Sequence, residues 1–176
     1  MPGRVTIGLY NSYDPVKFHE SHRRALARAG PVALAFDCNL ATFGFPYDKE
    51  LSTPVEIANW VSTTTSIGES GAYLIDLSQK GRFSSFGYPN KGFPPQLGPA
   101  VATTRRPEPS KSVSPSDVRS KLKSGQSMLL VFGLGPHGLP KEVFAMCEKH
   151  LDITGRGMSL ETCTALGVVI GSLLGK

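Results

Sequence analysis

The stretch from 127 to 174 most constrains how this chain can fold. It begins with an apolar run, Ser127 to Phe132, that has the length and composition of a strand buried on both faces. A glycine-rich turn follows at 133–139, and Pro140 suits the first turn of a helix, where its missing N–H is tolerated. This order predicts a central strand, a sharp turn and a short amphipathic helix that ends near His150.

The same pattern then repeats. Residues 151–153 are typical of a second strand, and the glycines of 154–157 form a second loop whose bare backbone can approach a ligand. Ser159 is a plausible N-cap for a closing apolar helix, although Glu161 also lies close to its start. Two glycine-rich loops at the ends of neighbouring strands predict a binding site.

The rest of the chain alternates strand and helix patterns. Such alternation predicts an α/β fold with a mostly parallel sheet covered by helices on both faces. A length of 176 residues suits a single domain, 1–176. We expect strands at 5–10, 32–36, 72–77 and 100–104, and helices at 15–30, 53–61 and 114–125.

The carboxyl ends of parallel strands meet at one edge of a sheet, where open α/β folds place their functional groups. The predicted strands bring five residues to this edge: Asn11, Asp37, Thr104, Gly133 and Thr154.

Residues 78–99 form a long segment rich in Gly, Pro, Ser and aromatic residues. A loop of this length is usually functional or mobile. Its Phe and Tyr side chains lie among Lys and Arg and could stack on exposed bases. We favour the simpler interpretation that the segment is an ordered lid packed by its own aromatic rings.

The net charge of +5 and a pI near 9.2 suit an anionic partner without proving one. Cys38, Cys147 and Cys163 are far apart and odd in number, which fits reduced thiols better than a disulfide framework or a metal site. No signal pattern or apolar run of membrane-spanning length is visible. We therefore expect a cytoplasmic protein with no metal and no membrane association.

The first glycine loop can be read literally as a dinucleotide fingerprint, Gly133-x-Gly135-x-x-Gly138, with Asp152 as the ribose-binding acid. A nicotinamide-dependent oxidoreductase is thus one hypothesis. Against it, such a fingerprint normally opens its domain, whereas only 24 residues of this sequence follow Asp152.

A second interpretation uses both loops together. The run Phe132-Gly133-x4-Gly138-Leu139-Pro140-x-Glu142 resembles the second motif of the SPOUT class of RNA methyltransferases. Ile153 followed by Gly155, Gly157 and Ser159-Leu160 resembles their third. Arg24-x5-Gly30 has the spacing of their first motif, whose arginine acts at the reaction centre. Within the class, the sequence is most similar to an archaeal branch with no assigned function.

This resemblance implies an α/β fold with a C-terminal trefoil knot, in which S-adenosylmethionine lies in the knotted crevice. It also implies a homodimer formed through the knot region. The Gly167-x-x-x-Gly171 groove of the last helix could contribute to this dimer or, equally, serve tight packing within the chain. The cofactor-binding residues that it implies are Thr103, Gly133, Leu134, Gly138, Ile153, Thr154, Gly155, Gly157 and Leu160.

For the reaction centre we expect Arg24, with Arg23 as the competing candidate. The guanidinium of an arginine keeps its proton at neutral pH and so does not readily act as a base, and a positioning role is expected. A solvated basic helix face is the alternative. Two residues depart from the motifs: Gly135 stands where many 2'-O-methylating members have glutamate, and Glu161 where they have asparagine. Glu161 could act as a base or, as we favour, cap its helix; Asp37 and His137 are further candidates.

Three functions remain open. The leading hypothesis is a methyltransferase that uses S-adenosylmethionine to modify RNA, either tRNA or rRNA. The second is a non-catalytic RNA-binding or assembly protein on the same scaffold, suggested by Gly135 and Glu161. The third is the nicotinamide-dependent oxidoreductase.

Overall fold

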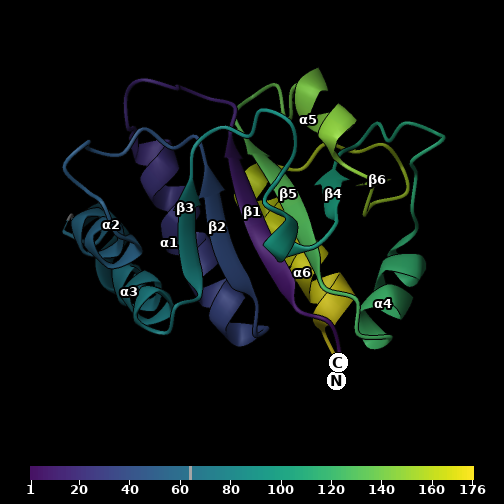
Figure 1. The fold of residues 1–176 in the computed structure, drawn as a ribbon, viewed down its shortest axis with the longest axis horizontal. Helices are drawn as coiled ribbons and strands as arrows, with labels where there is room; N and C mark the ends of the chain where they lie inside the picture. The colour runs from purple at the N-terminus through teal and green to yellow at the C-terminus, as the bar shows by residue number, and fades with distance from the viewer. Residues whose placement is uncertain (64) are drawn as a thin grey trace.

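The computed structural model describes residues 1–63 and 65–176. Its centre is a six-stranded parallel sheet of order β3-β2-β1-β5-β4-β6 (Figure 1). The strands are β1 (Val5–Asn11), β2 (Asn39–Phe43), β3 (Phe83–Phe86), β4 (Ala100–Thr103), β5 (Met128–Leu134) and β6 (Lys149–Leu151). The helices are α1 (Glu20–Ala35), α2 (Pro54–Val61), α3 (Gly71–Gln79), α4 (Pro115–Lys123), α5 (Lys141–Met146) and α6 (Thr162–Leu174), with short 3-10 turns η1 (Thr65–Ser70) and η2 (Pro95–Leu97).

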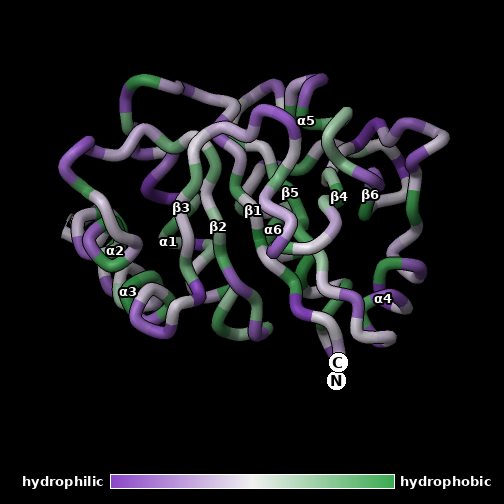
Figure 2. The backbone as a smooth tube through the Cα atoms, in the orientation of Figure 1, coloured by the Kyte–Doolittle hydropathy of each residue, from purple (hydrophilic) through white to green (hydrophobic). Residues whose placement is uncertain are grey.

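The expected α/β architecture with a parallel sheet is confirmed. Alternate residues of the central strands face opposite sides, so Ile7 and Leu130 join one apolar cluster while Leu129 and Val131 join another. Helices α1, α2, α3, α4 and α6 supply the first cluster. The second face is covered by α5 and by the segment around Phe93. Figure 2 shows the hydrophobic strands inside and hydrophilic loops around them.

Two predicted strands are helical instead. Residues 32–36 complete α1, and residues 72–77 lie in α3, where Leu74 and Leu77 are buried at helical spacing. Short apolar runs fit a buried helix as well as a buried strand, and periodicity does not separate them. Gly30, taken as a helix stop, instead lets α3 approach closely, because a Cβ there would lie 3.3 Å from the Tyr73 Cβ.

The prediction that Asp37 lies at the carboxyl edge of the sheet is consequently wrong. Asp37 lies in the turn between α1 and β2, at the amino end of β2, with a positive φ of 54°. Its carboxylate pairs with Arg4 and Arg82, each at 3.3 Å. Asp37 therefore holds a turn at the edge of the sheet opposite to the predicted site, which excludes it as a base there.

The segment 78–99 is ordered rather than a bare loop, because it contains β3 and η2. The Phe86 and Phe93 rings pack on Phe43, with centroids 5.4 and 5.0 Å away. Tyr88 donates a hydrogen bond to the Asn11 carbonyl at 2.8 Å. The segment is therefore ordered, as the favoured interpretation predicted, but Phe86 and Phe93 pack on Phe43 of β2 and strand β3 was not predicted.

Strand β6 is inserted between two earlier parts of the chain. On one side it pairs with β4; on the other, His150 accepts a hydrogen bond from Val113 N and donates one to Lys111 O. The Lys111 ammonium also binds the carbonyls of Phe144 and Cys147, at 3.2 and 3.1 Å. The chain enters β6 from α5 on one face of the sheet and leaves toward α6 on the other (Figure 1).

Within the described part of the chain, no helix combines the length and the apolar character needed to cross a membrane.

Candidate functional site

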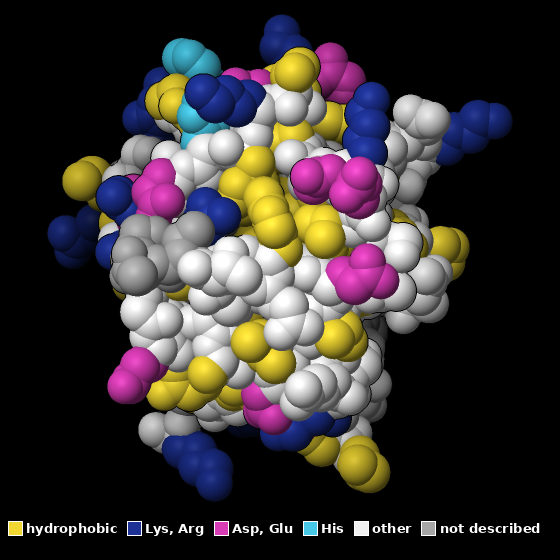
Figure 3. Space-filling model, turned by 90° about the vertical axis from the view of Figure 1, so that its left-hand side faces the viewer, with side chains coloured by type: hydrophobic (Ala, Val, Ile, Leu, Met, Phe, Trp, Pro, Cys, Tyr) yellow, Lys and Arg dark blue, Asp and Glu magenta, His cyan; other side chains and the backbone are white. Residues whose placement is uncertain are grey.

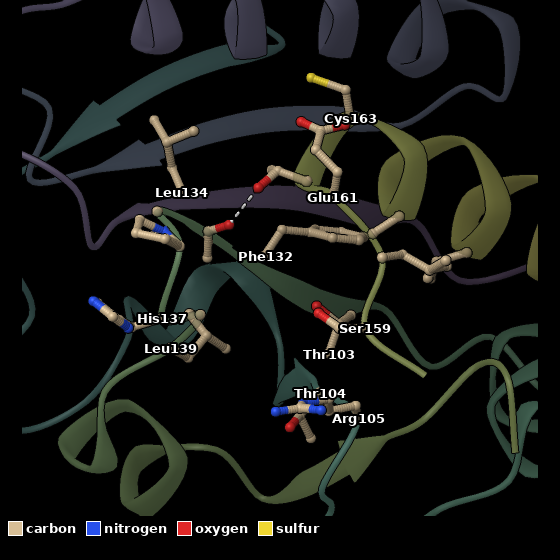
Figure 4. A pocket seen from close by; sticks show the side chains of 18 of the residues that line it. Thr103, Thr104, Arg105, Phe132, Leu134, His137, Leu139, Ser159, Glu161 and Cys163 are labelled. Atoms are coloured by element: carbon tan, nitrogen blue, oxygen red, sulfur yellow. Dashed lines mark hydrogen bonds between the residues drawn. The ribbon is translucent and has the colours of Figure 1, made fainter. Parts of the chain in front are cut away.

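A cavity of about 1150 Å³ lies at the carboxyl ends of β4, β5 and β6. Figure 4 shows its walls: His137 and Leu139 from the first glycine loop on one side, Ser159, Glu161 and Cys163 at the start of α6 on the other, and Thr104 and Arg105 below. Such a volume exceeds the needs of one nucleoside, because small-molecule sites usually enclose about 300–1000 Å³.

Six of the nine predicted cofactor-binding residues line this cavity: Thr103, Gly133, Leu134, Gly138, Ile153 and Leu160. Most of this wall is backbone or apolar side chain. The Thr103 hydroxyl is not free, since it donates to the Val131 carbonyl at 2.8 Å. A side chain at Gly133 would not fit, because its Cβ would lie 2.9 Å from the carbonyl carbon of Gly138.

The other three, Thr154, Gly155 and Gly157, are not among the cavity-lining residues. Asp152 explains this difference. Its carboxylate accepts hydrogen bonds from the backbone N–H groups of Thr154 and Gly157, at 3.1 and 2.9 Å. Although partial burial raises the pKa of Asp152, a hydrogen bond from the Thr154 hydroxyl at 2.8 Å together with these backbone bonds outweighs it and lowers the pKa below its usual value. Two amides of the second loop, those of Thr154 and Gly157, are thus engaged by the loop's own aspartate, and a cofactor contact by this loop stays a prediction.

Thr162 connects the start of α6 to the first glycine loop. Its hydroxyl donates a hydrogen bond to the Gly133 carbonyl at 2.8 Å, drawn as the dashed line in Figure 4. This bond connects the start of α6 to the end of β5 and fixes the width of the cavity between them.

The structure separates the two arginine candidates. Arg24 lines the cavity, with a side chain that is 63% exposed, and Arg28 lies one turn further along the same helix face. Arg23 points elsewhere: its side chain is 12% exposed, donates to the Val61 carbonyl and lies over the rings of Phe18 and Trp60. Arg23 therefore packs α1 against α2 and cannot reach a ligand in the cavity.

Glu161 caps its helix, as favoured over a role as base, but it is itself the N-cap of α6, so the prediction that Ser159 is the N-cap is wrong. Its carboxylate accepts a hydrogen bond from Thr164 N at 3.1 Å. Burial raises the pKa of Glu161, but hydrogen bonds from the Cys163 and Thr164 amides outweigh this and lower it. Glu161 lines the cavity as an ionised cap that is a poor proton acceptor.

Several cavity residues were missed by sequence reasoning. Besides Arg28, they are Tyr13, Ser21, Arg106 and Met158. The Arg105-Arg106 pair after β4 is a recognisable signal for an anion site at a strand end. Nothing in the local sequence marks Tyr13. On the side of the molecule drawn in Figure 3, histidine and basic side chains gather at the upper edge, toward the carboxyl ends of the strands.

His22 lies beside the cavity-lining residue Tyr13, with ring centroids 5.8 Å apart. It is fully buried and its Nδ1 accepts the His19 N–H at 2.9 Å, so Nε2 carries the proton that it donates to Asn11 Oδ1 at 3.0 Å. Desolvation, helped by the nearby His19, lowers the pKa of His22 to about 4.

This burial predicts a pH-dependent stability. Below about pH 6.5, His22 is protonated in the unfolded chain but stays neutral in the folded protein until about pH 4. The free energy of unfolding should therefore fall progressively as the pH is lowered from 6.5 to about 4. The expected loss is about 2 to 3 kcal/mol, measured by urea unfolding at a series of pH values. In a His22→Leu variant, which has no proton to bind, the slope in this window should shrink; an unchanged slope would contradict the assignment.

The structure does not favour the nicotinamide hypothesis. The literal fingerprint follows β5 rather than the first strand, and it leads into α5, a helix of six residues. The carboxylate of Asp152 is occupied by its own loop and is not free to bind a ribose. Among the described residues, no group of three or more His, Cys, Asp or Glu side chains is arranged to hold a metal ion.

Comparison with solved structures identifies similar folds. A probable methylase family protein from Haemophilus influenzae is similar with a TM-score of 0.63 and 14% identity, covering 98% of this chain and 66% of that one. The SpoU methyltransferase AviRb from Streptomyces viridochromogenes, solved with AdoMet, gives a TM-score of 0.57 and 14% identity, covering 99% and 58%. A structure described in terms of 2-OH methylation of C/U34 on tRNA gives 0.57 and 18%, covering 98% and 95%. The chain thus spans about two thirds of the Haemophilus protein and more than half of AviRb.

These likenesses define the fold as that of the SpoU-type, or SPOUT, methyltransferases. The chain itself belongs to a family described as "Protein of unknown function (DUF531)", whose model matches residues 5–174. An uncharacterized protein from Methanocaldococcus jannaschii is 45% identical over 166 residues, covering 94% of this chain and 90% of that protein. This relative agrees with the archaeal branch indicated by the motifs.

Proposed function

We propose that this protein is an S-adenosylmethionine-dependent methyltransferase that acts on RNA, either tRNA or rRNA. One observation carries the proposal: a single cavity joins the first glycine loop, the start of α6 and the exposed Arg24. A second class of observation supports it, since similar folds include an AdoMet-bound methyltransferase and a structure concerned with tRNA methylation.

The cavity wall suits the cofactor. Adenine needs a narrow, partly apolar slot with backbone hydrogen-bonding groups, and Leu134, Ile153 and Leu160 line a wall whose loop is tightened at Gly133. The sulfonium and amino groups are cationic, and the ionised carboxylates of Asp152 and Glu161 lie in the same cavity. S-adenosylmethionine supplies an activated methyl group when bound.

The protein's own tasks are then alignment and proton removal. We assign alignment of the acceptor, or of an adjacent phosphate, to Arg24, because an arginine holds its charge and its donors point in a fixed fork. Arg28, Arg105 and Arg106 add positive charge around the same cavity. Since Glu161 serves as a cap, His137 is the cavity-lining candidate for accepting the proton.

We also propose the trefoil knot and the dimer. The insertion of β6 between β4 and residues 111–113 supports threading of the C-terminal segment through the loop closed by β4, α4 and β5. On α6, a Cβ added at Gly167 or Gly171 would meet open space, and Val168 is 42% exposed. This face would allow close approach of a second copy.

The decisive experiment combines calorimetry with methyl transfer. S-adenosylhomocysteine should bind the purified protein, and labelled S-adenosylmethionine should transfer its methyl group to tRNA or rRNA. A Thr162→Val variant loses the hydrogen bond to Gly133 and should bind the cofactor product about five-fold more weakly, the equivalent of about 1 kcal/mol. Thr63→Val is the matched control and should bind normally, because it also removes a threonine hydroxyl that donates to a backbone carbonyl, that of Trp60 at 2.7 Å, but outside the cavity lining.

The outcomes distinguish the alternatives. Absence of S-adenosylhomocysteine binding would refute the cofactor assignment. Cofactor and RNA binding without methyl transfer would favour the non-catalytic RNA-binding hypothesis.

A further inference from the structure

Among the described Phe, Tyr and Trp residues that line the cavity, Tyr13 is the exposed one. Two other aromatic side chains line the cavity, Phe132 and Phe144, but Phe132 is only 1% exposed and Phe144 is half-buried against the sheet. Tyr13 is 46% exposed and follows directly on the carboxyl end of β1. An exposed ring at the mouth of a large cavity is available to a ligand.

The segment that carries Tyr13 is firmly held. Ser12 donates two hydrogen bonds to the Leu134 carbonyl, from its amide and its hydroxyl, both at 3.0 Å. The Tyr13 amide donates to Asn11 Oδ1 at 3.1 Å, and Asn11 itself is buried. The Tyr13 ring lies against the rings of His19 and His22, with centroids 5.2 and 5.8 Å away. Because the ring is already ordered, it would lose little conformational entropy on binding.

Gly135 makes this arrangement possible. A Cβ at position 135 would lie 2.7 Å from the Ser12 carbonyl oxygen and 3.2 Å from Tyr13 N, and the φ angle of 148° also favours glycine. The departure from the glutamate-containing motif therefore has a structural correlate, because the segment with Tyr13 occupies the space beside the cofactor loop that a side chain would need.

The charges nearby fit a nucleotide. Arg24 and Arg28 line the same cavity as Tyr13. Both belong to α1, which begins a few residues after Tyr13. Aromatic rings bind bases through their faces, while guanidinium groups bind phosphates. A ring and two arginines around one opening match a single unstacked nucleotide better than a duplex, whose bases are not accessible to stacking.

We propose that Tyr13 is a stacking platform for the base of the acceptor nucleotide, which is drawn out of its RNA helix or loop into the cavity. This inference rests on the proposed RNA methyltransferase function. It assigns substrate recognition to the aromatic face of Tyr13 and not to its hydroxyl, and it defines the substrate class as an unpaired or flipped-out nucleotide.

Kinetics with the substrate RNA test the proposal. Tyr13→Ala should lower kcat/KM for RNA by about ten-fold or more, since one base stacked on an aromatic ring is worth on that order. The affinity for S-adenosylhomocysteine should stay the same, and Tyr13→Phe should restore most of the loss. Tyr73→Ala, which removes a ring of equal exposure (47%) on α3, is the control. Normal kcat/KM for RNA in Tyr13→Ala would overturn the proposal.

Fluorescence separates this proposal from the proposed function. The chain has one tryptophan, Trp60, so the additional emission of a Tyr13→Trp variant reports on position 13. A short single-stranded RNA of mixed sequence should quench this emission, whereas the emission of a Tyr73→Trp variant should not respond. Quenching without methyl transfer would support base stacking at position 13 and refute the proposed methyltransferase activity. Methyl transfer without quenching would support the activity and refute the stacking role of Tyr13.

Discussion

Replacing Arg24 with alanine should reduce methyl transfer to RNA by about 100-fold or more while leaving the affinity for S-adenosylhomocysteine unchanged. Arg24 lines the cavity, and its Nε lies 3.9 Å from Glu20, a separation too long to hold the guanidinium tightly. Its charge is therefore available to the substrate. Removing one preorganised donor from a reacting centre typically lowers kcat by about 10²–10³-fold. Single-turnover methyl transfer and calorimetry on the same preparation would measure the two quantities separately.

Two variants sharpen this test. Lys17→Ala removes a cation from the neighbouring segment that does not line the cavity, so it should change the rate little. Arg24→Lys keeps the charge but loses the planar fork and should recover only part of the activity. Full activity in Arg24→Ala would contradict the role of Arg24 and would point to another cation of the cavity, with Arg28 the first candidate.

The second large effect is expected at Gly135. Gly135→Ala should destabilise the protein by about 3 kcal/mol, because the new methyl group adds backbone strain at a positive φ and collides with the Ser12 carbonyl. To relieve the collision, the segment with Tyr13 must move away from Leu134. Urea unfolding would measure the loss, and weaker RNA binding should accompany it.

Gly138→Ala is the matched control for this prediction. Gly138 lies in the same loop and also has a positive φ, 67°, but a Cβ there would meet nothing within 4 Å. Its substitution should lower the free energy of unfolding by about 1 kcal/mol, the cost of placing a side chain on a backbone with positive φ. Equal losses of stability at the two positions would show that the contact with Ser12 contributes nothing.

The C-terminal part of the fold was predictable from the sequence because its signals are local. An apolar run between glycines marks β5, and Pro140 marks the start of α5. The boundaries further along were wrong, because α5 ends at Met146 and His150 already lies in β6. The same kind of signal misled at residues 32–36, where an apolar run after Gly30 and Pro31 belongs to α1 instead. There the decisive interaction is the packing of Gly30 against α3, which local sequence does not encode.

The candidate site shows the same division. Residues whose backbone lines the cavity, such as Gly133, follow from the motif. For the second loop, a glycine-rich sequence does not reveal that Asp152 binds the loop's own amides, and the binding of cofactor by Thr154, Gly155 and Gly157 stays a prediction. The contact of Gly135 with Ser12 joins residues more than 120 positions apart, and neither residue's neighbours in the sequence point to it.

The position of β6 has a consequence for ligand binding. Its two hydrogen-bonded flanks are β4 on one side and residues 111–113 on the other. Leu151 to Ile153 and the beginning of α6 line the cavity, so the cavity is complete only while β6 is docked between these flanks. A ligand that binds the complete cavity should therefore stabilise the docked position of β6 against local unfolding.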